Sequence, residues 1–428
     1  MKKLFISLVV ISLYSCNSNK AITDIVFADS ILTNYSSPSA IKNNAADLQF
    51  WQSRITSNPG IVNELKYAAA LMGRFHLLGN IKDVKTADQI LIKIDSTFNH
   101  KEAAPILALI SHSILQHQFK QAENYLQKAT SIGLKKYDEH AIAFDVYFET
   151  GEYNRAYQHL LAIKNNNDYG YQFRLSKWEH YKSNLEGSIA AMQKATDLSG
   201  SDTSLLQAAL SNTADLYLHN NNLEKAQELY KKSLQLSVAD LHSLLGIGWI
   251  ALAQDKNYEV ADKIFKFVAT KNASPDPIFK LIQMAEAKGD KKMAVQWANK
   301  FVTMAGHKNY GNMYNKYLIE IYNDILNEPA KAVSIATSEL ENRATPQTYA
   351  WYAYSLFKNG QLPEALAIFK EQVSGKPLEG LELFWVGKMM MGNNKGFNAK
   401  AFFKEAYKNR FDISPAKKTE LESISVIK

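Results

Sequence analysis

A small side chain recurs through most of this sequence at intervals of about 35 residues, each time within the same apolar pattern. A fixed period of this length is typical of a repeat array, in which each repeat is one supersecondary unit that stacks on its neighbours. We therefore expect a solenoid and not a globular body built around one core. The recurring positions are Ala87, Ala122, Ala156, Ser188, Ala226, Ala261, Ala294, Ala332, Ala365 and Ala399.

Residues 206–236 show the repeating unit most clearly. Apolar or small side chains recur at three- and four-residue spacing in residues 206–217 and again in residues 223–233, which predicts two amphipathic helices. Three asparagines at 220–222 separate them, and asparagine tolerates the left-handed backbone of a tight turn. The small side chain of Ala226 would let the two helices approach to about 8–10 Å. Large side chains stand four residues after most of the small ones and would fill the gap to the next pair: Leu91, Leu126, Leu160, Met192, Tyr230, Phe265, Phe369 and Phe403.

The pattern resembles the tetratricopeptide repeat (TPR) family over residues 61–412. Residues 151–153 (Gly-Glu-Tyr) before Ala156, and 360–362 (Gly-Gln-Leu) before Ala365, look like that family's turn between helices. The resemblance implies an all-α, right-handed superhelical solenoid of about ten antiparallel helix pairs. The sequence departs from the pattern at Ala298 and Ala336, where a large residue is expected, and at Glu339 and Gln372, where a small or apolar one is expected.

The amino terminus is typical of an export signal. Lys2 and Lys3 precede an apolar stretch at 4–14, which is shorter than the roughly 20 residues that span a bilayer. Cys16 is the only cysteine, and residues 13–16 (Leu-Tyr-Ser-Cys) are similar to the lipobox of bacterial lipoproteins of the Bacteroidota type. That resemblance makes Cys16 the predicted lipidation site and membrane anchor.

Four segments follow from these patterns. They are a lipoprotein signal peptide at 1–15, a lipid tether and N-terminal helical cap at 16–60, the TPR array at 61–412, and a C-terminal tail or cap at 413–428. Within the cap, residues 21–32 and 46–56 look helical, with a break at 36–44. Lipoproteins of the Bacteroidota type, which this amino terminus resembles, often carry acidic residues just after the cysteine when they reach the cell surface. Residues 17–20 contain none, so the resemblance favours an outer-membrane position facing the periplasm over the cell surface.

Composition and spacing argue against nucleic-acid binding and against catalysis. The chain has 49 Lys and Arg against 42 Asp and Glu, a formal charge of +7 that is too dilute for a nucleic-acid interface. His112 and His117 are five residues apart and not at the four-residue spacing of a helical zinc site. No set of nucleophile and base stands out. We therefore predict no enzymatic activity, no cofactor and no metal.

A concave groove is the predicted functional surface. The TPR resemblance implies that the first helices of successive repeats line this groove and hold a segment of a protein or peptide partner. An ordinary solvated inner face is the alternative reading for each position. In the late repeats, Trp351 and Trp385 are expected in the core, which leaves aromatic and basic side chains facing the groove. The candidate groove residues are Asp145, Lys177, Tyr181, Asp215, His219, Tyr354, Phe357, Lys358 and Lys388.

These features predict a membrane-anchored TPR scaffold that mediates protein–protein interactions in the bacterial envelope. The alternative is a nutrient- or glycan-binding outer-membrane lipoprotein of the starch-uptake type, a class that also contains TPR units. Such proteins need a large non-repeat region for their ligand platform, and here only residues 17–60 and the tail lie outside the repeats. The scaffold is therefore the preferred prediction.

Overall fold

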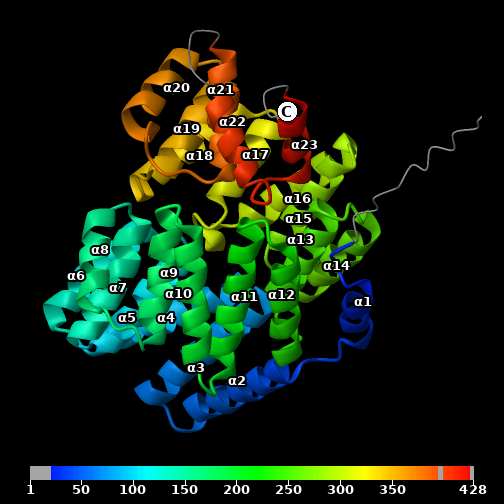
Figure 1. Cartoon of the computed structure of the whole chain (residues 1–428). Coiled ribbons are helices and arrows are strands. Elements are labelled where there is room, and N and C mark those ends of the chain that lie inside the picture. The colour runs from blue at the N-terminus through cyan, green and yellow to red at the C-terminus, as the bar shows by residue number, and fades with distance from the viewer. Residues whose placement is uncertain (1–20, 394–398, 425–428) are drawn as a thin grey trace, which may run out of the picture.

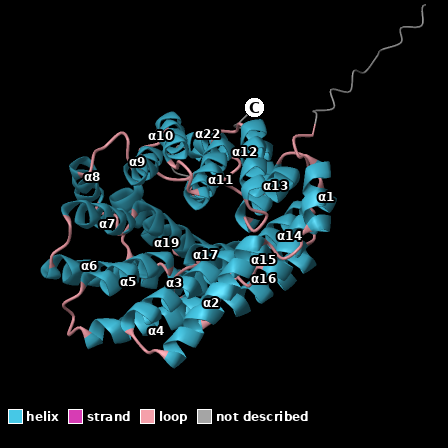
Figure 2. Ribbon diagram, turned by 90° about the horizontal axis from the view of Figure 1, so that it is seen from below, coloured by secondary structure: helices cyan, strands magenta, loops and turns pink. Residues whose placement is uncertain are grey.

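The computed structural model describes residues 21–393 and 399–424, and all regular structure in these residues is helical (Figures 1 and 2). The predicted signal peptide and Cys16 lie outside the described residues. The helices are α1 (Ile25–Asn34), α2 (Ser39–Ser57), α3 (Ile61–Leu78), α4 (Ile81–Thr97), α5 (Ala103–Leu115), α6 (Phe119–Ile132), α7 (Lys136–Glu149), α8 (Tyr153–Ala162), α9 (Tyr169–Tyr181), α10 (Leu185–Leu198), α11 (Thr203–His219), α12 (Leu223–Leu236), α13 (Leu241–Ala253), α14 (Tyr258–Lys271), α15 (Asp276–Ala287), α16 (Lys291–Ala305), the short turn η1 (Lys308–Tyr310), α17 (Asn315–Asp324), α18 (Pro329–Asn342), α19 (Pro346–Lys358), α20 (Leu362–Ile368) with its wider turn η2 (Phe369–Val373), α21 (Gly380–Gly392), α22 (Ala399–Lys408) and α23 (Pro415–Ser423).

From α3 onward the helices pack in consecutive pairs, α3 with α4 through to α21 with α22. Nine of the ten recurring small residues are buried to 4% exposure or less, and the tenth, Ala399, is half-buried. The large side chains four residues later are buried as well. Helices can approach closely only where a small side chain lies at the crossing, so the period read from the sequence is the period of helix pairing. The all-α solenoid of about ten pairs is confirmed.

The repeat formed by α11 and α12 matches its prediction in detail. Asn221 in the turn adopts a left-handed backbone with φ +57°, and the side chain of Asn222 accepts a hydrogen bond from the Lys225 amide to cap α12. Ala226 is fully buried, and Tyr230 is 1% exposed.

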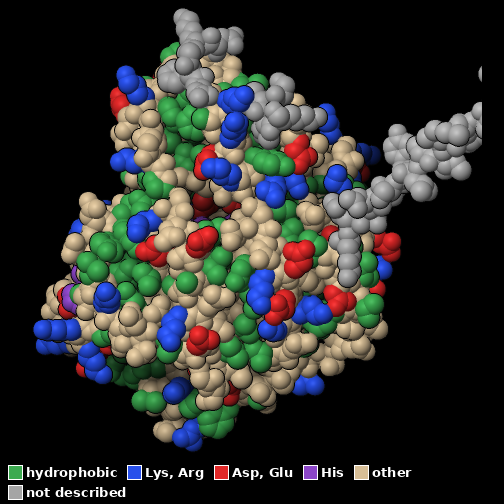
Figure 3. All heavy atoms as spheres, viewed as in Figure 1, with side chains coloured by type: hydrophobic (Ala, Val, Ile, Leu, Met, Phe, Trp, Pro, Cys, Tyr) green, Lys and Arg blue, Asp and Glu red, His purple; other side chains and the backbone are tan. Residues whose placement is uncertain are grey.

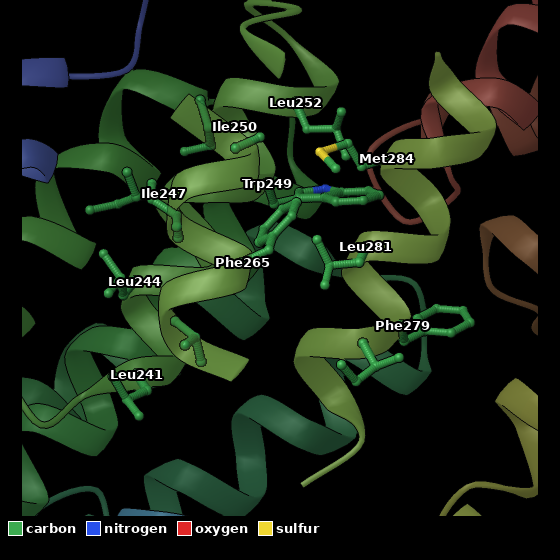
Figure 4. Close-up of a cluster of buried hydrophobic side chains, with 14 of the residues drawn as sticks. Leu241, Leu244, Ile247, Trp249, Ile250, Leu252, Phe265, Phe279, Leu281 and Met284 are labelled. Carbon is green, nitrogen blue, oxygen red and sulfur yellow. The ribbon is translucent and has the colours of Figure 1, made fainter. Parts of the chain in front are cut away.

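A large cluster of buried hydrophobic side chains lies where α13 packs against α12, α14 and α15 (Figure 4). Leu244, Ile247 and Ile250 are fully buried there together with Phe265. Gly246 of α13 permits this packing, because a Cβ at that position would lie 2.4 Å from the ring of Tyr230 on α12. A helix buried on several sides has no polar face, which explains why the α13 sequence is apolar nearly all round.

The N-terminal cap differs from its sequence prediction. The break between the two cap helices covers only residues 35–38, and residues 39–44, predicted as part of the break, are helical. The Asn44 side chain donates a hydrogen bond of 2.9 Å to the Ala70 carbonyl of α3. This contact stabilises the helical form of residues 39–44, whose polar sequence does not by itself favour a helix.

Repeats far apart in the sequence also contact one another. The side chain of Asn342, the last residue of α18, donates to the His117 carbonyl between α5 and α6 at 2.8 Å. The backbone amide of Ala273 donates to the Leu78 carbonyl at 2.8 Å. The array therefore curls back on itself (Figure 2). In a solenoid whose repeats contact only their neighbours, the concave side is open. Here the contacts between distant repeats cover much of the concave side.

The C-terminal segment covers much of that concave side. Residues 408–418 cross from α22 to the middle repeats. There the Trp249 indole donates a hydrogen bond to the Phe411 carbonyl at 3.0 Å, and the side-chain amide of Asn221 donates to the Lys408 carbonyl at 3.0 Å. Part of the predicted tail forms the helix α23, which packs on α15. Two cavities remain on the concave side. In the described part of the chain, no helix combines the length and the apolar character needed to cross a membrane.

Candidate functional site

The larger cavity, here called the main recess, has a volume of about 760 Å³ and lies between the middle repeats and the C-terminal repeats. Figure 3 shows it as a recess below the C-terminal helices, with charged side chains around it. Helices α8, α9 and α11 form one side, and the loops that precede α19 and α21, together with α22, form the other. Representative lining residues are Lys177, Tyr181, Arg343, Trp351, Glu379 and Asp412.

Stacked tyrosines form one wall of the main recess. The rings of Tyr153 and Tyr181 stack with centroids 3.9 Å apart and planes 21° apart, and Phe148 meets Tyr181 edge-on at 5.8 Å. Burial raises the pKa of both tyrosines, so their hydroxyls stay protonated and can donate hydrogen bonds. This wall offers a flat apolar surface with polar tips.

Ion pairs join the two sides of the recess near this wall. Glu149 lies 2.5 Å from Lys177 and 3.6 Å from Arg343, and Arg343 also contacts Glu339 at 2.9 Å. Burial opposes the ionisation of Glu149, but the two cations lower its pKa below the usual range. The Glu149 carboxylate therefore links α7 to the loop after α18 across many repeats.

A second set of ion pairs lies deeper in the recess. Lys316 contacts Glu379 at 3.0 Å and Glu382 at 3.1 Å, and Lys316 lowers the pKa of Glu379 to about 2. His219 contacts the carboxylate of Asp412. Because most of these charges neutralise one another inside the protein, the recess presents a fixed polar lining without a strong net field for either sign of ligand.

The smaller cavity, here called the inner cavity, has a volume of about 410 Å³. His219, Lys316 and Asp412 line both cavities and so separate them. In the inner cavity Asp215 accepts a hydrogen bond of 2.6 Å from Tyr230 and pairs with His242 at 2.8 Å. The Asp215 carboxylate raises the pKa of His242 to about 9.

Four of the nine predicted groove residues line these cavities. Lys177 and Tyr181 line the main recess, Asp215 lines the inner cavity, and His219 lines both. Asp145 lies outside both linings and forms an ion pair of 2.6 Å with Arg174.

The four predicted groove residues of the C-terminal repeats, Tyr354, Phe357, Lys358 and Lys388, line neither cavity. The expectation that Tyr354 faces the groove is wrong. Tyr354 is 3% exposed, stacks on Trp385 at 4.8 Å and donates a hydrogen bond to Asp324 at 2.9 Å. Phe357 is half-buried, Lys388 pairs with Glu420 of α23, and Lys358 at the end of α19 lines neither cavity. The curled C-terminal repeats turn a different face of α19 toward the main recess. Trp351 is buried, as expected from the sequence, and it also lines the main recess.

The sequence reasoning missed the residues contributed by loops and by the C-terminal segment. Arg343, Glu379 and Asp412 lie outside the first helices, where groove residues were sought. One signal was present. Glu339, one of the four departures from the repeat pattern, is fully buried and accepts hydrogen bonds from Arg343 and from Asn315 at 2.7 Å. A charged residue at a core position indicates a buried partner nearby.

In the part of the chain that the structure describes, no group of His, Cys, Asp and Glu side chains has an arrangement that could hold a metal ion. Consecutive helix pairs, nine of them closed over a buried small side chain, decide the fold. The chain forms a TPR-type solenoid. No family model matches the chain, and no curated protein matches it.

The TPR solenoid is similar to several solved structures at low sequence identity. One is Pseudomonas aeruginosa PilF, at 16% identity and TM-score 0.36, covering 51% of this chain and 99% of that one. Another is a tetratricopeptide repeat protein from Parabacteroides merdae, at 16% identity and TM-score 0.34, covering 67% and 97%. Yeast Tom70 has 14% identity and TM-score 0.35, covering 93% and 94%.

Proposed function

We propose that this chain is a membrane-anchored TPR scaffold of the bacterial envelope that holds a short extended segment of a protein partner in the main recess. The observation that carries the proposal is the stacked pair Tyr153 and Tyr181 on the concave side, beside charges that are already neutralised. Aromatic side chains at the centre of a concave surface are frequent anchors of protein interfaces, whereas exposed charges contribute less.

The anchoring part of the proposal rests on residues 13–16 and Cys16. A lipid on Cys16 would tether the array to a membrane through the segment before α1, and we place it at the outer membrane facing the periplasm, with the cell surface as the other position. We expect Cys16→Ser to accumulate as an unprocessed precursor. Fatty-acid labelling that persists in this variant would contradict the lipoprotein assignment.

Partner capture is tested by crosslinking and co-purification from membranes. We compare the wild type with Tyr181→Ala, which removes half of the stacked wall, and with Tyr258→Ala on α14, which lies outside both cavities. The proposal expects one defined protein with the wild type and with Tyr258→Ala, and its loss with Tyr181→Ala, while circular dichroism shows that all three are folded. A protein partner retained by Tyr181→Ala would move the binding surface elsewhere. A bound glycan in place of a protein would support the starch-uptake alternative.

A further inference from the structure

One face of α15 is turned into the inner cavity. Asp276, Lys280 and Gln283 line this cavity, and their four- and three-residue spacing places them on a single stripe of the helix. Asp276 accepts a hydrogen bond of 2.8 Å from Tyr314. The other two polar side chains have no comparable partner.

Lys280 is a cation without an acceptor. Its ammonium lies 3.9 Å from the centroid of the Trp249 ring, and no described side chain or carbonyl accepts a hydrogen bond from it. Burial lowers the pKa of Lys280 to about 8, although Asp276, Asp215 and Glu320 lie near enough to favour its charge. In the described structure, Lys177, Lys316 and Lys408 of the two cavity linings each have a carboxylate partner. Lys280 and Lys376 do not, and the N–H groups of Lys280 are therefore free to donate to a ligand.

Gln283 provides a second unsatisfied group at the same place. It is 6% exposed, and its carbonyl oxygen is buried without any hydrogen-bond partner. Buried amide groups in folded proteins are nearly always hydrogen-bonded, and each exception requires an explanation such as a missing ligand. The cavity beside Gln283 is wide enough to contain one.

Four aromatic side chains supply apolar surface to the inner cavity. Trp249, Phe279, Tyr317 and Phe411 come from three helices and the C-terminal segment, and the rings of Phe279 and Tyr317 lie 4.4 Å apart. Burial raises the pKa of Tyr317 to about 12, and its hydroxyl makes no hydrogen bond within the described chain. Aromatic walls with a few convergent polar groups are the usual composition of a small-molecule site.

We propose that the inner cavity binds a small organic acid with a flat apolar body and a hydroxyl group. Its carboxylate accepts hydrogen bonds from Lys280, its hydroxyl donates to the carbonyl oxygen of Gln283, and its body lies among the aromatic side chains. A singly charged carboxylate suits this site better than a phosphate, because Asp276, Asp215 and Glu320 would repel a second negative charge. The other charges of the cavity are already paired: Asp215 with His242, Asp412 with His219, and Glu320 with Lys417. This site is separate from partner capture in the main recess and does not depend on it.

The test uses the full lipid-free chain from residue 17 onward and 1-naphthoate as the probe, with binding followed by calorimetry. The expected result is a single site for 1-naphthoate, with affinity at least about tenfold weaker for the neutral 1-naphthamide, because a charge-assisted hydrogen bond is lost. Lys280→Met should weaken naphthoate binding by a similar factor, while its methionine still packs on Trp249. The matched control is Lys288→Met at the exposed end of the same helix, which should bind like the wild type.

A second variant keeps the proposal falsifiable if Lys280→Met does not fold. Gln283→Glu changes the shape little and places a negative charge beside the bound carboxylate, so it should also abolish naphthoate binding. The absence of naphthoate binding at millimolar concentration would overturn the proposal and indicate a cavity filled by water. Equal affinity for naphthamide, or unchanged binding by folded Lys280→Met, would overturn it as well. None of these outcomes bears on the Tyr181 co-purification result.

Discussion

At the scale of single residues, side-chain volume at one position per repeat decides how closely two helices pack. Ala226 is fully buried between α11 and α12, and the large Tyr230 one turn later fills the adjacent space, with its hydroxyl bonded to Asp215. The same arrangement of a small and then a large side chain recurs along the array, so the repeats tolerate changes of surface residues more readily than changes of volume at these positions.

We expect Ala226→Leu to lower the free energy of unfolding by about 1–3 kcal/mol, because extra methylenes at a close helix crossing force backbone shifts. Urea unfolding followed by circular dichroism measures the change. Ala69→Leu on the exposed side of α3 is the control and should leave the midpoint near that of the wild type. An unchanged midpoint for Ala226→Leu would mean that α11 and α12 are not paired as described.

The ion pair between His219 and Asp412 makes stability depend on pH. Burial opposes the charged form of His219, but the Asp412 carboxylate raises its pKa to about 9, above its ordinary 6.5. The folded state thus holds the proton more tightly than the unfolded chain does. The stabilisation is complete below about pH 6.5 and is lost as the pH rises through about 9.

We therefore expect the urea midpoint of the wild type to fall between pH 6.5 and 9, and His219→Gln to show a shallower fall over the same range. His242, whose pKa Asp215 also raises to about 9, contributes in the same direction and remains in the variant. Lys280, with its pKa lowered to about 8, works in the opposite direction above that pH, so the comparison between the two proteins isolates His219. Parallel pH profiles would rule out the His219–Asp412 pair as a source of stability.

At the scale of elements, the C-terminal helix α23 holds the late repeats against the middle ones. Lys417 of α23 is 5% exposed and lies 2.7 Å from Glu320 and 3.3 Å from Asp324, both on α17. Burial opposes its charge, but these carboxylates raise its pKa well above the ordinary value. This short helix therefore docks through one buried cation and one fully buried apolar side chain, Leu421.

We expect Lys417→Met to destabilise the protein by about 3–5 kcal/mol, because it leaves Glu320 and Asp324 buried without their cation. Thermal and urea unfolding measure the loss. Lys404→Met on the exposed face of α22 serves as the control. A loss below 1 kcal/mol for Lys417→Met would show that α23 is not docked through this pair.

At the scale of the whole molecule, the array departs from the nearest-neighbour behaviour of an open solenoid. Hydrogen bonds join Trp249 to Phe411 and Asn342 to His117 across 162 and 225 residues of chain. Such contacts couple the stability of distant repeats, which a one-dimensional stack would keep nearly independent.

Truncation after residue 408 should therefore speed amide hydrogen exchange in α11, which loses the pair between His219 and Asp412, and in α13, which loses the hydrogen bond between Trp249 and Phe411. Hydrogen-exchange mass spectrometry resolves this by segment, with α5 and α6 as the internal reference because they do not contact the removed residues. Faster exchange confined to α21 and α22 would contradict long-range coupling.

The sequence by itself determined the helix pairs. Ala226, Tyr230 and the asparagine turn at 220–222 act through contacts within one repeat, and such local contacts leave a periodic trace in the chain. It also determined that Trp351 and Trp385 are buried, since both lie on the apolar stripe of their helices.

Only the tertiary structure decided which side chains line the concave side. Small rotations between successive repeats accumulate over the array, so no local pattern shows that Arg343 reaches Glu149 or that Asp412 reaches His219. The same accumulation turned Tyr354 away from the recess and placed Lys280 inside the inner cavity. Helix pairing within a repeat depends on residues close together in the sequence, so their spacing reveals it. The closure of the array depends on the sum of the rotations between all successive repeats, and no single stretch of sequence contains that sum.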